Sequence, residues 1–92
     1  MQNNATAVPP LTDEYRKAAH KKMTAYTAAT LAGASVPGLR KGLAEAVKRY
    51  RLAANMSECP TKHAHLARDR VVAHQIMMEL ERRGVPASLE VA

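Results

Sequence analysis

The side chains best suited to chemistry in this sequence are four cations in its middle part. When residues are placed on a helix at about 100° each, these four share one arc beside an apolar face and form what we call the basic face: Arg40, Lys41, Lys48 and Arg51. A guanidinium presents a planar fork to a phosphate or carboxylate, and an ammonium presents a point charge. The row is typical of a surface that binds an anionic partner, although the same residue types also cover ordinary solvated helix faces.

The placement of charge strengthens this interpretation. The formal net charge is +6, and residues 15–51 carry nine basic residues against one acid, whereas residues 52–92 carry five of each. The excess therefore lies in the first half of the folded chain, where Lys21 and Lys22 add to the basic face. We expect these residues to meet nucleic acid or an acidic protein surface, which makes the protein a non-catalytic binding protein that acts as a regulator or inhibitor.

Residues 27–52 offer a sharper alternative. Ala29, Gly33 and Leu39 resemble the Ala–Gly–aliphatic spacing of a helix-turn-helix, in which a small residue lets two helices approach and the glycine makes the turn. Gly42 stands where an apolar residue should lock the second helix, so the match is partial. The alternative is a DNA-binding transcriptional regulator, and a structural or assembly subunit is a further one.

No base-stacking surface accompanies the cations. The three aromatic residues fall on or near apolar stripes, where we expect them to belong to the core: Tyr15, Tyr26 and Tyr50.

Other reactive side chains do not assemble into a recognisable chemistry. Cys59 and His63 are four residues apart, but His65 and His74 fall elsewhere on a helix, so no tetrahedral zinc site is expected. His65 and Asp69 are spaced to pair, which is the orienting half of a catalytic triad, yet no nucleophile motif accompanies them. We therefore expect no catalysis, no metal and no cofactor.

Helices must position these side chains. The hydrophobic periodicity predicts one helical domain over residues 11–86, with helices at about 12–32, 36–55 and 60–83, a flexible arm at 1–10 and a short tail at 87–92. This is a small three-helix bundle, or a helical hairpin with an additional helix.

The expected helix ends rest on local signals. Thr12 and Ser35 are predicted N-caps, and Ser57 is a better predicted cap than Cys59 because its hydroxyl accepts a free backbone N–H. Gly84 is predicted to end the last helix in the left-handed conformation.

Apolar stripes define the expected core. The second helix offers Leu39, Leu43, Ala46, Val47, Tyr50, Ala53 and Ala54, and the third offers Leu66, Val72, Ala73, Ile76, Met77 and Leu80. Met78 falls off the stripe and is expected either to widen the core or to meet another chain.

Composition suggests a thin core. The chain has neither Trp nor Phe, and much of its hydrophobic content is alanine, which buries little area per residue. We therefore expect a homo-oligomer.

The lone cysteine suits a reducing cytoplasm, and the amino terminus lacks the pattern of a signal peptide. No apolar run is long enough to span a bilayer. We therefore expect a cytoplasmic protein without membrane contact.

Overall fold

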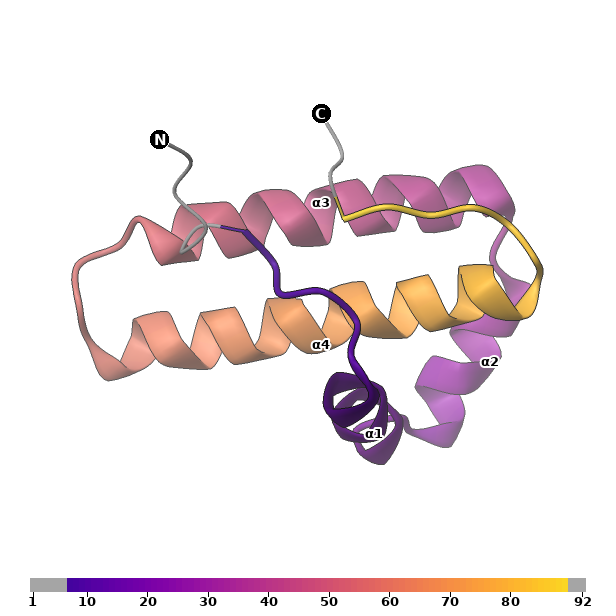
Figure 1. Cartoon of the computed structure of the whole chain (residues 1–92), viewed down its shortest axis with the longest axis horizontal. Coiled ribbons are helices and arrows are strands. Elements are labelled where there is room, and N and C mark those ends of the chain that lie inside the picture. The colour runs from indigo at the N-terminus through magenta and orange to yellow at the C-terminus, as the bar shows by residue number, and fades with distance from the viewer. Residues whose placement is uncertain (1–6, 90–92) are drawn as a thin grey trace.

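The computed structural model describes residues 7–89, which form four helices and no strand. The helices are α1 (Asp13–Lys21), α2 (Ala25–Gly33), α3 (Val36–Ala54) and α4 (Pro60–Arg82). The predicted all-α class is confirmed, but the three-helix bundle is wrong. Instead, α3 and α4 form an antiparallel hairpin, and two short helices, rather than one, pack on α4 (Figure 1). Within the described range, no helix combines the length and apolar character needed to cross a membrane.

The single helix predicted at 12–32 is in fact two helices. Thr12 caps α1 as predicted, and its Oγ1 accepts from the backbone N–H of Tyr15 at 3.3 Å. Thr24 begins a new helix in the same way, because its Oγ1 accepts from the N–H of Thr27 at 3.0 Å. A β-branched residue with a hydroxyl is more favourable as a cap than inside a helix, which explains the break.

The start and the buried face of α3 are as predicted. The Oγ of Ser35 accepts from the N–H of Gly38 at 3.1 Å, and Pro37 lies in the first turn. The predicted apolar face is turned inward, with Ala54 half-buried and the other members buried: Leu39, Leu43, Ala46, Val47, Tyr50 and Ala53.

α4 is the central helix, and α1, α2 and α3 all pack against it. Its cap is Cys59, which is one of the two predicted caps, and the preference for Ser57 is wrong. The Cys59 side chain makes no capping hydrogen bond within the described residues. Pro60 occupies the first turn, which leaves the residue directly before it as the cap. The other end is as predicted: Gly84 has a φ of +72°, and the N–H of Val85 donates to the Leu80 carbonyl at 2.9 Å.

The segment before α1 closes one side of the core. Val8 is buried, and Nε2 of His74 donates to the Pro9 carbonyl at 2.8 Å as the segment crosses α4 (Figure 1). The prediction of a flexible arm is therefore wrong for residues 7–10, and its remainder, residues 1–6, lies outside the described residues.

The segment after α4 runs back along α3 (Figure 1). Three apolar side chains of this segment pack on the core: Val85, Ala87 and Leu89. The last two belong to the predicted tail. Residues 90–92 of the predicted tail lie outside the described residues. The two flanking segments thus complete a core that the hairpin alone leaves open.

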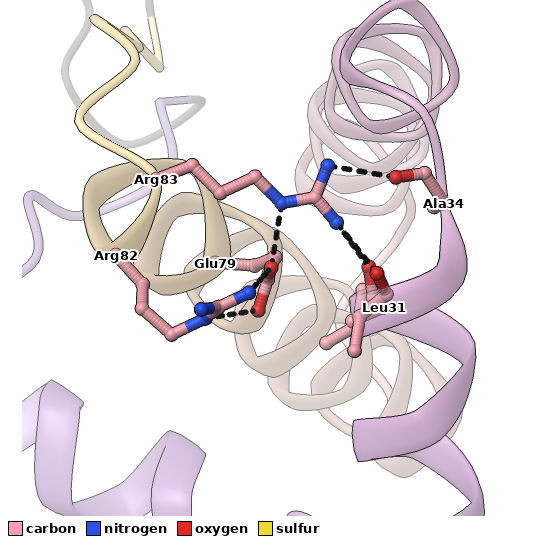
Figure 2. Close-up of polar contacts among 6 residues, drawn as sticks. Leu31, Ala34, Glu79, Arg82 and Arg83 are labelled. Carbon is pink, nitrogen blue, oxygen red and sulfur yellow. Dashed lines mark hydrogen bonds and ion pairs between the residues drawn. The ribbon is translucent and has the colours of Figure 1, made fainter.

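Arg83 ties the end of α4 to the end of α2 (Figure 2). Its guanidinium donates to the carbonyls of Ala34 at 2.7 Å, Leu31 at 2.8 Å and Ala32 at 3.0 Å. The last carbonyls of a helix have no partner within the helix and carry the negative end of its dipole. A cation placed there donates hydrogen bonds to the carbonyls and offsets the negative charge of the dipole. Glu79 holds the same guanidinium from the opposite side, accepting from Nε at 2.7 Å.

Glu79 makes the free energy of unfolding depend on pH. Hydrogen bonds from Arg82 and then Arg83 lower its pKa to about 2, from 4.5 for an ordinary glutamate. Because the folded state holds this proton less tightly than the unfolded state, the stabilising contribution of Glu79 is present above pH 4.5 and is lost as the pH falls toward 2. In urea unfolding, Glu79→Gln should therefore be less stable than the unchanged protein at about pH 6, and by a smaller margin at about pH 3.

Glu45→Gln is the matched control, because Glu45 is exposed and makes no ion pair within residues 7–89. A stability margin for Glu79→Gln that stayed constant from about pH 6 to about pH 3 would contradict this account.

Two glycines should respond in opposite ways to alanine. At Gly84 the φ of +72° is unfavourable for any L side chain, so Gly84→Ala should reduce the free energy of unfolding by about 1–2 kcal/mol. Gly33 is helical, and an added Cβ there would meet nothing within 4 Å, so Gly33→Ala should raise it by about 0.5–1 kcal/mol. Denaturant unfolding of both variants measures the difference, and equal effects would contradict the assignment of the helix end.

Candidate functional site

The basic face lies on the outer surface of α3. The core side of this helix faces α4, so its opposite side forms the edge of the molecule (Figure 1). All four side chains of the basic face are exposed. Arg40 and Arg51 are eleven residues apart, a distance of about 17 Å along the helix axis, so the face is long enough for an extended or helical segment of a partner.

The positive charge of the basic face is not neutralised by ion pairs within the described residues. Within residues 7–89, none of its four cations forms an ion pair, and Glu45, the one carboxylate on α3, is not paired with any of them. Arginines that pack on or belong to α4 behave differently, for example Arg16, which pairs with Glu81 at 2.6 Å. Four unpaired cations beside one acid create a positive potential that attracts an anionic group from solution.

A hollow of about 370 Å³ follows the same side of α3. The hollow is lined by one carboxylate, Glu45, and by Asn55, together with three cations of the basic face and three apolar side chains: Lys41, Lys48, Arg51, Ala44, Val47 and Leu52. Leu52 is 62% exposed, so its apolar side chain is open to solvent at this hollow. The hollow therefore offers both cationic groups and an apolar contact.

Arg49 has a structural role, although it lies next to Lys48 in the sequence. Its Nε donates to Oδ1 of Asp69 at 3.2 Å, and Nε of Arg68 lies 3.5 Å from the same oxygen. The Asp69 side chain is only 2% exposed, so these cations offset the cost of burying its charge. The predicted pair of Asp69 with His65 is therefore wrong, and the carboxylate joins α4 to α3 instead.

Lys21 and Lys22 are exposed but are not part of the basic face. They lie at the end of α1, which packs on α4 on the side away from α3 (Figure 1). Lys22 lines a separate hollow of about 370 Å³ together with Arg68 and Arg70 of α4. Of the six predicted site residues, the structure thus brings together the four on α3.

The histidines have local partners. His63 pairs with Glu58, and His74 is buried against Tyr15, with 5.1 Å between the ring centres. Burial lowers the pKa of His74, so its neutral form is favoured beside the Pro9 carbonyl. Within residues 7–89, no three His, Cys, Asp or Glu side chains are grouped closely enough to hold a metal ion.

The geometry does not supply the close helix contact on which the helix-turn-helix alternative rests. Ala29 is exposed, and a Cβ at Gly33 would meet nothing within 4 Å. The close approach occurs instead at Gly42, where a Cβ would lie 3.3 Å from Cδ1 of Ile76 on α4. Tyr26 also differs from expectation: it is 81% exposed rather than part of a core.

Replacing neighbouring arginines should separate structural cations from binding cations. Arg49→Met leaves the buried Asp69 carboxylate with Arg68 alone and should lower the free energy of unfolding by about 1–3 kcal/mol. Arg51→Met removes an exposed cation without an ion-pair partner among residues 7–89 and should change it by about 0.5 kcal/mol or less. Denaturant unfolding at neutral pH measures both, and a larger loss for Arg51→Met would show that the roles are reversed.

Comparison with known proteins leaves the basic face to be interpreted from its own chemistry. No protein-family model, no curated protein and no solved structure matches this chain. What the site binds must therefore follow from its charge, shape and exposure.

Proposed function

We propose that this is a non-catalytic binding protein that engages an anionic partner through the basic face of α3. The observation that carries the proposal is the row of four exposed cations without ion-pair partners among residues 7–89. Arg49 and Arg83, by contrast, have carboxylate or carbonyl partners within the fold. Charges that the fold does not use are available for a partner.

An acidic protein surface suits this site better than a nucleic-acid backbone does. Leu52 is 62% exposed at the hollow between the cations, and an apolar side chain of a protein partner would cover it. A phosphate backbone offers no such contact. Tyr15 and Tyr50 are packed against the fold rather than presented to bases, and Tyr26, which is 81% exposed, belongs to α2 rather than to the basic face. The partner in this proposal carries carboxylates that flank an apolar group.

Binding of this kind acts by occupying a surface of the partner, as a regulator or inhibitor does. Carboxylates of the partner accept charge-assisted hydrogen bonds from the lysines and arginines of the basic face. The positive potential speeds the encounter, and salt weakens it because exposed charges are screened. No bond is made or broken in this account.

A polyanion titration tests the proposal. Fluorescently labelled poly-glutamate should bind the protein, with an affinity that falls as salt is raised. The double variant Lys48→Glu/Arg51→Glu should weaken binding by about tenfold or more, since it reverses two of the four charges of the basic face. Lys21→Glu/Lys22→Glu makes the same charge change on α1 and should alter the affinity by about twofold or less.

Equal losses in the two double variants would mean that poly-glutamate responds to net charge alone, and the proposal would then be wrong. A labelled DNA duplex, titrated in parallel, decides between partner classes. Tighter binding to one duplex sequence than to others would favour the DNA-binding regulator instead.

A further inference from the structure

α2 combines an uncharged sequence with an exposed position. It is the one helix of residues 7–89 without a charged residue, and none of its nine residues is buried. Tyr26 is 81% exposed, the highest value among the large hydrophobic residues that stand exposed. A helix of this length has little stability of its own in water, so α2 depends on contacts outside itself.

A hollow of about 670 Å³ lies beside α2. Its apolar lining comes from α2, the turn before it and α4: Met23, Ala28, Leu31, Ala32 and Met78. Charged groups at this hollow are already paired within the chain. Arg16 bonds Glu81 at 2.6 Å, and Arg82 bonds Glu79. The surface is therefore apolar in its centre and carries paired charges around it.

We infer that α2 and this hollow, which we call the α2 surface, form the interface between two copies of this chain. An acidic partner finds no unpaired cation on the lining of the hollow, whereas it finds four on the basic face. A partner that fits must instead be uncharged and apolar where it touches α2. Among the four helices of the described chain, α2 itself is the element with that character, so the surface is self-complementary, as a two-fold interface requires.

The shape of α2 agrees with this occupant. Ala25, Ala29 and Ala32 are exposed and recur at steps of four and three residues, which places them along one side of the helix. Small side chains let a second helix approach closely. Tyr26 lies on the neighbouring side and Met78 lines the hollow, and tyrosine and methionine are both enriched at protein interfaces.

Charge opposes the association only in part. The net charge of +6 makes two copies repel, and the exposed Lys21 and Lys22 lie just before α2, but the four unpaired cations of the basic face lie on α3, across α4 from α1 and close to α2 only at the connecting turn (Figure 1). A dimer joined through α2 would keep both basic faces exposed, and a partner with two acidic segments would then bind more tightly than one with a single segment.

Sedimentation equilibrium of the full chain over a range of concentrations tests the inference. The unchanged protein should reach twice its chain mass of 10.0 kDa at high concentration. Ala29→Glu places a charge in the middle of the α2 surface and should weaken the dimer by about tenfold or more, and Tyr26→Ala should weaken it by a smaller factor. Ala64→Glu makes the same change at an exposed alanine of α4, near its start and away from α2, and should leave the dimer constant within about twofold.

Helix content from circular dichroism must be the same in all variants, which separates dissociation from unfolding. A protein that stays at 10.0 kDa at every concentration, or a dimer that Ala29→Glu and Tyr26→Ala leave intact, would overturn the inference. Poly-glutamate binding provides an independent readout, because the Ala29→Glu monomer should keep the affinity of its basic face for a single acidic segment. Loss of the dimer and loss of the anion site are thus distinguishable.

Discussion

The fold depends on three buried polar side chains of α4. Each of them forms a hydrogen bond with a different neighbouring element. Asp69 bonds Arg49 of α3, Gln75 donates to the Ala19 carbonyl of α1 at 3.1 Å, and His74 donates to the segment before α1. A buried polar group without a partner costs about 1–3 kcal/mol, so any other arrangement of these elements around α4 would be penalised. Alanine-rich helices bury little area, and these polar contacts give the packing the specificity that apolar area alone does not provide.

Arg83 and Arg70 show two other ways in which the α4 region meets its neighbours. Arg83 satisfies three carbonyls at and beyond the end of α2 while Glu79 neutralises it, so one cation fixes the direction of a helix that buries no residue of its own. Arg70 is the exception among the polar groups, because its buried Nε has no hydrogen-bond partner among residues 7–89. Its guanidinium lies over the ring of Tyr15, 4.9 Å from the centre. The negative face of the ring attracts the cation and partly compensates for the missing hydrogen bond.

The features that could be predicted from the sequence are those set by local chemistry. Ser35 caps a helix through its own hydroxyl, Gly84 adopts a conformation that its neighbours require, and the apolar face of α3 repeats over five turns. The same local chemistry at Thr24 marks the break between α1 and α2. In the sequence, a weak apolar stripe continues through this position and predicts a single helix, because a capping threonine and an interior threonine look alike without the partner N–H.

What could not be predicted depends on contacts distant in sequence. Asp69, His74 and Gln75 interrupt the apolar pattern of α4, and their partners lie between 20 and 65 residues away. A helix with neighbours on several sides loses the simple periodicity of a surface helix, since no single stripe faces the core. The basic face was predictable for the opposite reason: the buried residues of α3 recur along one face of the helix, so its solvent side keeps a regular pattern.

This asymmetry between α3 and α4 explains how a small chain can carry both a stable fold and an unpaired basic surface. Polar and charged groups on α4 are used to bind the other elements, so α3 needs only its apolar face and Arg49 to be held in place. The remaining cations of α3 can then stay unpaired at little cost, because they are exposed to water and make no contact on which the fold depends. Helix α2, whose end accepts hydrogen bonds from the guanidinium of Arg83, is likewise left with an uncharged outer side. Concentrating the polar contacts on one central helix therefore leaves two chemically distinct surfaces available, one cationic and one apolar.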